Sequence, residues 1–516
     1  MKKKLGLVVK LFAAVFIFLF VYRVFQKITE PRVLFQFCHL IFIVCLLAWG
    51  LLISWQTLFI KPFARIVELT EIKNLLMVSM LITASFVLTA VSFALRGRET
   101  SQTHFLIPYD SLFIQAFLYA GIFIVLIWMG HAFFNRKIPE RDPCLYPLIC
   151  FLAGVGLVFL FRLGPDLYEI RKLSSFQNLA WFQLRSIGIS FFVLMVSVIV
   201  FSDQQLEAIT RKRYIYVIVS IVLISLTAVI GTEINGRKLS LNFGIINFQT
   251  VEMVKIFALL FMVGYFRYER SFLESGKNFF NIPRMRYLMP YLIMWVLTLM
   301  PIFFQKDLGP TVLIFLLFVT VFYLGTGSWV SVLVGFIILV TTGIGAYFAQ
   351  FPSMVKTRVD MWLDPFHYSQ NLAEALWAVS EGGWFGTGLA QGFSHRIPVV
   401  QSDFNFAAIA EEWGFLGGFM VFWVICLLVF KALALARQTH LSYVQLFISG
   451  LAVLWLFQTL IIVGGNLGLM PLTGITLPFI SYGGSSLLVN FMAAGIVLRF
   501  SHDHSLYQSN QKRKDS

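Results

Sequence analysis

Apolar stretches of about twenty residues recur along the whole sequence, and they constrain the fold more than any other feature. A helix needs roughly 20 mostly apolar residues to cross a lipid bilayer. Only 13% of the residues are charged, against about 25% in a typical soluble domain. The pattern predicts an all-α polytopic membrane protein. Its fourteen candidate membrane spans lie near residues 5–25, 34–55, 74–95, 113–133, 145–163, 185–201, 214–231, 250–266, 287–304, 308–325, 329–349, 405–433, 443–465 and 481–500.

The first of these segments allows two interpretations. A positively charged start followed by an apolar run is typical of a signal peptide. The sequence MKKKLGLVVKLFAAVFIFLFVYRVFQ has no convincing small-residue cleavage site after its apolar run. The absence of that site favours a retained membrane anchor over a removed peptide.

Basic residues predict how the chain is oriented in the membrane. A net charge of +15 could indicate nucleic-acid binding, but the charges form short clusters between apolar runs, which excludes a nucleic-acid partner. If the N-terminus is cytoplasmic, the alternation of spans also places the C-terminus in the cytoplasm and the loop 350–404 outside. Basic loops on the cytoplasmic side are the usual arrangement. The clusters are Lys2–Lys4, Arg136–Lys137, Arg211–Arg213, Arg284–Arg286 and Lys512–Lys514.

The outer loop 350–404 is the longest segment between spans and contains a conspicuous carboxylate, Asp364, in the stretch MWLDPFHYSQ. Pro365 disfavours the right-handed helical conformation at Asp364. The apolar spacing from residue 372 to residue 379 then predicts an amphipathic helix at the membrane interface. This loop is therefore expected to be a structured cap. Asp364 is either a reactive group or the N-cap of the following helix, a common role for Asp.

Two further sites carry charge at the outer ends of spans. Glu252 and Lys255 stand three residues apart, a spacing that allows an ion pair on one helix face; charges at membrane depth are either paired or functional. Arg237 and Lys238 precede them and could attract an anionic headgroup. Asp307 begins another span, where a carboxylate also stabilises a helix N-terminus.

A stretch near residues 464–485, GGNLGLMPLTGITLPFISYGGSS, interrupts the apolar sequence with glycines and prolines. Broken backbone at membrane depth is tolerated only where it is buried in protein or lines a wet cavity. The sequence therefore predicts a re-entrant turn beside a polar, outward-facing cavity, which suits an amphipathic lipid substrate.

Taken together, these stretches resemble one family, the shape, elongation, division and sporulation (SEDS) family of RodA/FtsW-type peptidoglycan polymerases. The resemblance rests on PLTGITLPFISYGGSS and SDFNFAAIAEEWGF, and it covers about residues 142–500 as a ten-span core. Residues 1–141 then form an extension with about four spans, and residues 501–516 a basic cytoplasmic tail. Three motifs depart from the family pattern: DPFHYSQN, QTVE and QKDLG.

The resemblance implies a glycosyltransferase in the bacterial cytoplasmic membrane that polymerises lipid II into glycan strands at the outer face. It also implies a class B penicillin-binding protein as partner, besides the nascent strand and the membrane lipids. By position, the family's catalytic aspartate is Asp364. The candidate substrate-binding residues are Arg237, Lys238, Glu252, Lys255, Asp307, Lys356, Arg358, Arg396, Asp403, Glu411, Ser481 and Ser485.

A carboxylate at position 364 suits the chemistry of glycan growth. A sugar hydroxyl is a poor nucleophile at neutral pH, and a general base typically accelerates its attack 10²–10⁴-fold. Partial burial near lipid would strengthen that base. Asp364 could instead hold a divalent cation, Mg²⁺ or Mn²⁺. Two other functions remain open, a lipid II flippase or other transporter and a non-enzymatic scaffold for cell-wall enzymes.

Overall fold

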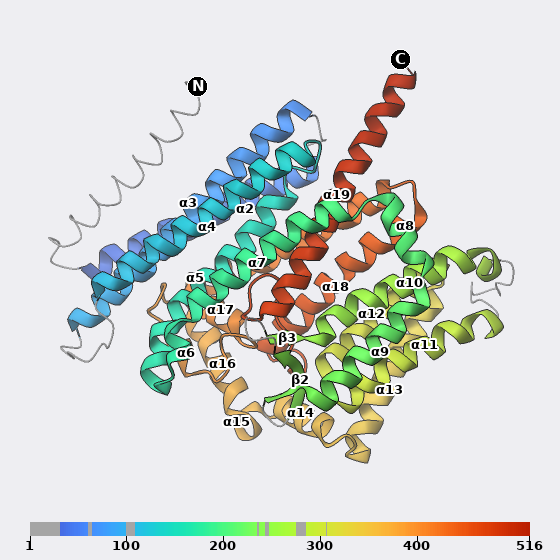
Figure 1. The fold of residues 1–516 in the computed structure, drawn as a ribbon. Coiled ribbons are helices and arrows are strands. Elements are labelled where there is room, and N and C mark those ends of the chain that lie inside the picture. Colours follow the sequence, from blue (N-terminus) through green and yellow to red (C-terminus); the bar gives the residue numbers. More distant parts are fainter. Residues whose placement is uncertain are drawn as a thin grey trace.

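The computed structural model is almost entirely helical and describes residues 31–59, 64–99, 109–234, 237–242, 247–274, 285–305 and 307–515 (Figure 1). The helices are α2 (Pro31–Phe59), α3 (Ala64–Glu99), α4 (Tyr109–Lys137), α5 (Leu145–Arg171), α6 (Ser174–Gln177), α7 (Leu179–Val200), α8 (Asp203–Arg211), α9 (Arg213–Ile230), α10 (Thr250–Glu274), α11 (Met285–Phe304), α12 (Leu308–Thr326), α13 (Trp329–Ala349), α14 (Ser353–Leu363), α15 (Pro365–Tyr368), α16 (Gln370–Gly382), η1 (Ser394–Arg396), α17 (Asn405–Gln438), α18 (Ser442–Asn466) and α19 (Gly484–Asp515).

The predicted all-α membrane architecture is confirmed. Thirteen of the predicted spans coincide with helices α2–α5, α7, α9–α13 and α17–α19. In the described part of the chain, 11 helices are long and apolar enough to cross a membrane. The two that fall short are α10, which carries several charges, and α11, whose apolar stretch Leu288–Phe303 is shorter. The first predicted segment, 5–25, lies outside the described residues.

Helix α5 lies at the centre of the bundle. Its most apolar window is completely buried, and α3, α7 and α17 pack around it. Small residues make this packing close. A methyl group at Gly156 would overlap the backbone carbonyl oxygen of Ile480, which belongs to the irregular segment 467–483 between α18 and α19. The core is therefore built around α5.

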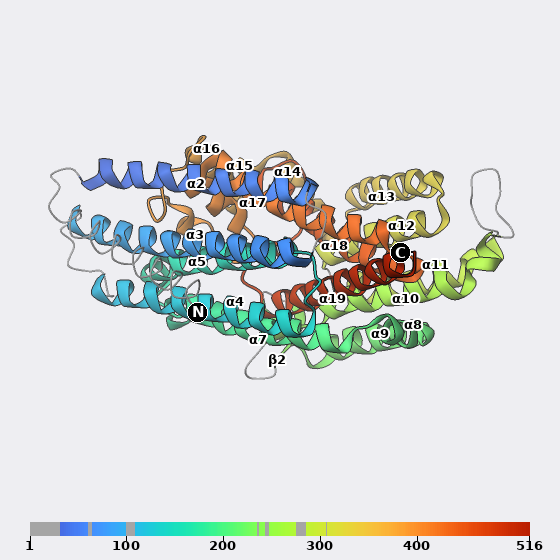
Figure 2. The ribbon, with the colours of Figure 1, turned by 90° about the horizontal axis from the view of Figure 1, so that it is seen from above.

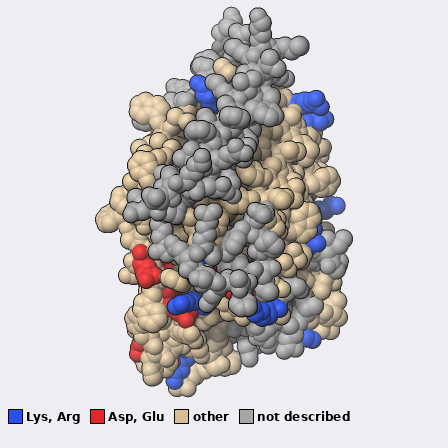
Figure 3. Space-filling view, turned by 90° about the vertical axis from the view of Figure 1, so that its left-hand side faces the viewer, with Lys and Arg blue, Asp and Glu red and all other residues tan. Residues whose placement is uncertain are grey.

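The N-terminal helices α2, α3 and α4 pack directly against the rest of the bundle. Helix α2 contacts α17, α3 contacts α5, and α4 contacts α7. Figures 1 and 2 show the three helices side by side along one flank of the molecule. Figure 3, which views the left-hand side of Figure 1, shows acidic side chains in the lower part of this face, next to basic ones.

The two ends of the bundle carry different structures. The loop 350–404, the irregular segment 467–483 and a small antiparallel sheet lie at one end, shown at the bottom of Figure 1. The sheet was not predicted. It has the order β1 (Thr232–Ile234), β2 (Arg237–Asn242) and β3 (Asn247–Gln249). The opposite end carries α8 and the last turns of α19.

The loop 350–404 is the structured cap that its sequence predicted. It contains α14, α15, α16 and η1. The predicted amphipathic helix is α16, which buries Leu372 against α17 and exposes Trp377. Ser369 begins α16 by accepting a hydrogen bond from the backbone N–H of Leu372. The cap therefore holds a defined position over the bundle.

Candidate functional site

Asp364 occupies the junction between α14 and α15. Its backbone is extended, as the following Pro365 requires, with φ −138° and ψ 79°. One carboxylate oxygen accepts a hydrogen bond from the backbone N–H of His367 at 3.3 Å. Asp364 thus caps the short helix α15, whereas the predicted amphipathic helix α16 is capped by Ser369. Capping uses one carboxylate oxygen and leaves the group accessible from solution.

The expected partial burial of Asp364 is wrong, because the residue is exposed. Its neighbours explain the difference. Phe366, Tyr368 and Trp377 are also exposed, and the rings of Phe366 and Trp377 lie 5.9 Å apart. Aromatic side chains of this kind gather at membrane interfaces. The carboxylate therefore lies at the aromatic rim of the cap rather than beneath it.

Helix α14 is anchored to the irregular segment 467–483. The Trp362 indole N–H donates to the backbone carbonyl of Gly468 at 2.8 Å. One turn earlier, the Arg358 guanidinium donates to the backbone carbonyl of Leu472 at 2.7 Å. Since Trp362 is two residues before Asp364, these bonds fix the position of the carboxylate relative to the bundle.

Asp403 also lies beside this segment. A methyl group at Gly474 would contact both its carboxylate and the Arg358 guanidinium, at 3.6 and 3.8 Å. Burial raises the pKa of Asp403, whereas the Ser402 hydroxyl and the Arg358 guanidinium lower it. The structure thus brings together the predicted residues Arg358 and Asp403.

A second group of predicted residues surrounds the start of α10. The Lys255 ammonium nitrogen lies 2.7 Å from the Glu252 carboxylate, and both side chains are buried. This is the ion pair that their spacing allows. Beside it, the Ser485 hydroxyl accepts from the backbone N–H of Gln249 at 2.9 Å and donates to the carbonyl of Asn247 at 3.0 Å. Ser485 therefore joins α19 to β3.

The remaining predicted residues do not form one cluster. Lys238 is exposed and donates to the carbonyl of Val229 at 3.0 Å, and Arg396 lies over the Phe393 ring at 4.8 Å. Asp307 is buried at the start of α12. The Ser481 hydroxyl accepts from the backbone N–H of Leu477 at 3.0 Å, and Lys356 is half-buried on α14. The side chain of Arg237 lies outside the described residues.

A buried charge network lies behind the cap, and of its members only Glu411 was predicted. The Arg162 guanidinium contacts the Glu412 carboxylate and donates to Asp166 and to the carbonyl of Gly392, both at 2.7 Å. Glu411 accepts from the backbone N–H of Phe393 at 2.6 Å. The sequence signal was present, since Arg162 and Asp166 stand four residues apart inside an apolar run.

The described residues do not form a metal-binding site by themselves. In the described ranges, no group of three or more His, Cys, Asp or Glu side chains is arranged to hold a metal ion. A single exposed carboxylate at Asp364 suits a cation only if a substrate supplies the other ligands, as phosphates do for Mg²⁺.

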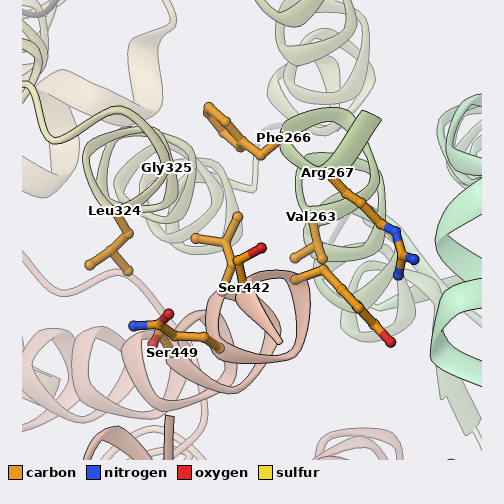
Figure 4. Close-up of a pocket in the computed structure, with 10 residues that line it drawn as sticks. Val263, Phe266, Arg267, Leu324, Gly325, Ser442 and Ser449 are labelled. Carbon is orange, nitrogen blue, oxygen red and sulfur yellow. The ribbon is translucent and has the colours of Figure 1, made fainter. Parts of the chain in front are cut away.

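Two cavities lie at the opposite end of the bundle from Asp364. One, of about 150 Å³, is enclosed by α10, α12 and the start of α18, and Figure 4 shows Val263, Leu324 and Ser442 around it. The other is lined by side chains of the α7–α8 junction and of α19, among them Asp203 and Asp503. Neither cavity is lined by residues of the loop 350–404.

Comparison with known proteins identifies relatives of this arrangement. A family model named for FtsW, RodA and SpoVE and described as "Cell cycle protein" matches residues 143–506. The peptidoglycan glycosyltransferase RodA of Mycobacterium tuberculosis is 32% identical over 397 residues, covering 74% of this chain and 83% of the relative. A probable peptidoglycan glycosyltransferase FtsW from Aliivibrio salmonicida is 32% identical, covering 64% of this chain and 82% of the relative.

Two solved structures share the fold. One, described as "Structural coordination of polymerization and crosslinking by a peptidoglycan synthase complex", superposes with a TM-score of 0.58 at 26% identity, covering 70% of this chain and 98% of that chain. The crystal structure of Thermus thermophilus RodA gives a TM-score of 0.51 at 24% identity, covering 70% and 97%.

Proposed function

Because the chain belongs to the FtsW, RodA and SpoVE family of cell cycle proteins, we propose that it polymerises lipid II into glycan strands, with Asp364 as the general base. The broader activity follows from its relatives, and the chain is a multi-pass membrane enzyme, a peptidoglycan glycosyltransferase. The substrate, the site and the residue roles are the proposed part.

The observation that carries the proposal is an accessible carboxylate held on both sides. Before Asp364, Trp362 bonds to the segment 467–483. After it, Pro365 and the capped helix α15 fix the chain direction. Asp364 accepts the proton of the attacking sugar hydroxyl as that oxygen bonds to the anomeric carbon and the prenyl pyrophosphate leaves. Holding a base in place lowers the barrier without reorganisation.

Cationic side chains near the cap complement the departing pyrophosphate. Arg358 and Lys356 lie on α14, six and eight residues before Asp364. Fixed positive charges stabilise the negative charge that develops on a leaving group. The other proposed substrate contacts come from segments at the same end of the bundle. They are Arg237, Lys238, Glu252, Lys255, Asp307, Arg396, Asp403, Glu411, Ser481 and Ser485.

The proposed setting is the outer face of the bacterial cytoplasmic membrane, with both termini in the cytoplasm. A class B penicillin-binding protein is the proposed partner that crosslinks the nascent strand. The support is a solved relative that belongs to a peptidoglycan synthase complex. Mg²⁺ or Mn²⁺ is a separate proposal, in which Asp364 and the substrate phosphates share the ligation. Chelation followed by addition of each metal tests it.

The test is lipid II polymerisation by the purified protein in lipid vesicles. Asn caps a helix about as well as Asp, so Asp364→Asn keeps the cap and removes only the base. We expect its turnover to fall about 10²–10⁴-fold. Asp360→Asn changes a half-buried carboxylate one turn earlier on the same helix and keeps an oxygen that can accept from the Tyr347 hydroxyl. It is the matched control and is expected to stay within threefold of wild type.

Three outcomes contradict the proposal in different ways. Equal polymer from wild type and Asp364→Asn removes this residue from the mechanism. Lipid II translocation without polymer identifies a flippase. Neither polymer nor translocation, with the partner protein still bound, identifies a scaffold.

A further inference from the structure

The N-terminal helices contact one particular part of the cap. We call residues 383–392, which follow α16 directly, the glycine-rich segment. On α3, the Arg96 guanidinium donates to the carbonyl of Ala390 at 3.0 Å, and the Ser92 hydroxyl accepts from the side-chain amide of Gln391. On α2, the His39 ring nitrogen lies 3.0 Å from the carbonyl of Phe385. Helices α2 and α3, which precede the matched family region, therefore make three polar contacts with this ten-residue segment of the core.

The same segment joins the cap to the bundle. The backbone N–H groups of Thr387 and Gly388 donate to the carbonyls of Glu411 and Glu412, at 3.0 and 3.1 Å. The carbonyl of Gly383 accepts from the backbone N–H of Phe415 at 2.8 Å. Since α16 ends where the segment begins, any shift of the segment moves α16 and the α15 turn that Asp364 caps.

The conformation of the segment needs support from outside. Gly383, Gly386, Gly388 and Ala390 all have positive φ, between 51° and 103°. Glycine gains no rigidity from its own side chain, and a non-glycine residue at positive φ persists only where its surroundings hold it. Arg96 bonds to Ala390, and the Phe35 ring of α2 packs at Gly388. The N-terminal helices thus support the strained positions themselves.

Arg96 also completes the charge of the buried network. Its guanidinium lies 3.0 Å from the Asp166 carboxylate, which is 4% exposed and already bonded to Arg162. Three carboxylates meet there, those of Asp166, Glu411 and Glu412. In the described part of the core, the Arg162 guanidinium contacts two of these carboxylates, those of Asp166 and Glu412. The His395 ring nitrogen lies 3.2 Å from Asp166. The N-terminal helices supply a second permanent cation.

We infer that Arg96 is a positioning residue for glycosyl transfer. Helix α3 holds the glycine-rich segment through Arg96 and Ser92, and the segment in turn holds α16 and the turn that presents Asp364. The inference rests on the proposed function for its catalytic consequence. It gives the N-terminal extension a role in the reaction that acts through the glycine-rich segment.

The experiment compares Arg96→Ala, Arg96→Lys and Ser92→Ala with Arg136→Ala, an exposed arginine at the far end of α4. Three quantities are measured on the full-length protein in vesicles: kcat with lipid II, KM with lipid II, and the rate of hydrogen exchange of the backbone amides of residues 384–392. Small displacements of a reacting group cost up to about 10²-fold in rate. We expect Arg96→Ala to lower kcat about tenfold with KM within twofold, Ser92→Ala and Arg96→Lys to lie between it and wild type, and Arg136→Ala to match wild type.

Hydrogen exchange separates this inference from the proposed function. If wild type makes no polymer, the proposed function fails, but faster exchange in Arg96→Ala than in Arg136→Ala still supports the contact between α3 and the segment. Faster exchange with unchanged kcat overturns the positioning role. A rise in KM alone does the same, because it assigns Arg96 to substrate binding. Ser92→Ala removes few atoms, so it answers the question if Arg96→Ala fails to fold.

Discussion

A charged side chain enclosed by apolar helices persists only where other groups satisfy it, and Arg162 is such a side chain. It is fully buried and serves two carboxylates and a carbonyl that come from three separate parts of the chain. Charges in membrane spans face the bundle interior and pair with one another. Arg162 thereby links α5 to α17 and to the glycine-rich segment.

Replacing Arg162 tests this link. Arg162→Met keeps most of the volume but leaves Asp166 and Glu412 without their shared cation. Breaking a buried ion pair by removing one partner costs about 3–5 kcal/mol, so we expect a loss of that size in the free energy of unfolding. Denaturant unfolding in detergent measures it. The exposed Arg396→Ala should change by less than about 0.5 kcal/mol, and a similar small change in Arg162→Met would contradict the assigned role.

Asp403 gives a prediction about pH. Because its pKa is raised in the folded protein, the folded state holds this proton at pH values where the unfolded state, with a pKa of about 3.9, has released it. Stability from this group is therefore present at low pH and is lost as pH rises through that interval. Asp403→Asn has no such loss. In thermal unfolding at constant ionic strength, the stability of the variant relative to wild type should rise with pH from about pH 4 upward. A difference in stability that does not change with pH would contradict the raised pKa.

At the scale of residues, sequence reasoning succeeded where chemistry is local. Pro365 constrains its neighbour, and the pair at positions 252 and 255 lies on one helix turn, so both features could be read from adjacent positions. The burial of Asp364 was misjudged because exposure depends on the whole cap. The network around Arg162 was missed because Gly392 and Glu412 stand more than two hundred residues away.

At the scale of elements, α14 is the part of the cap that is bonded to the segment 467–483. Its last turn is held by Trp362 and the turn before it by Arg358, and both bonds reach the same irregular segment. That segment has positive φ at Gly468 and Gly474, so it turns tightly and presents backbone carbonyls to α14. The segment that interrupts the apolar sequence therefore supplies the backbone carbonyls that accept hydrogen bonds from the cap.

Trp362→Phe tests the role of α14. The change removes the indole N–H but keeps an aromatic ring, and a hydrogen bond of this kind contributes about 1 kcal/mol. If that energy holds α14 in register, kcat with lipid II should fall about fivefold while the fold persists. The exposed Trp384→Phe is the matched control, since its ring packs edge-on against Phe415. Equal turnover for the two variants would show that the bond to Gly468 does not position the cap.

The apolar pattern predicts the membrane part of each helix but not where the helix ends. The predicted spans ended at 266 and 433, close to the basic residues Arg267 and Lys431, but the helices continue to Glu274 and Gln438. A helix keeps its backbone hydrogen bonds when it leaves the bilayer, so apolarity marks the membrane part and not the helix end. The sheet β1–β3 was missed because β1 and β3 have only three residues each, and the alternation of Leu239 and Leu241 in β2 is too short to stand out.

At the scale of the whole molecule, contacts between loops show which loops lie at the same end of the bundle. At one end, Arg213 pairs with Glu269, and His440 stacks on Tyr507. At the other, Tyr482 bonds to Gln401. The segments predicted to be cytoplasmic therefore meet one another, and so do the segments predicted to be outside. This grouping follows from the alternation of the spans, because each span carries the chain from one end of the bundle to the other.

The remaining question at this scale is which end faces the cytoplasm. Basic loops favour the cytoplasmic side, and the clusters at Arg136–Lys137 and Arg211–Arg213 lie at the end away from Asp364. We therefore expect a membrane-impermeant maleimide to label Gln370→Cys in intact cells and Gln508→Cys only after permeabilisation. Both positions are exposed. The unaltered chain is the control for its own cysteines. The reverse labelling would put Asp364 in the cytoplasm, where no strand can grow outward, and would end the proposed function.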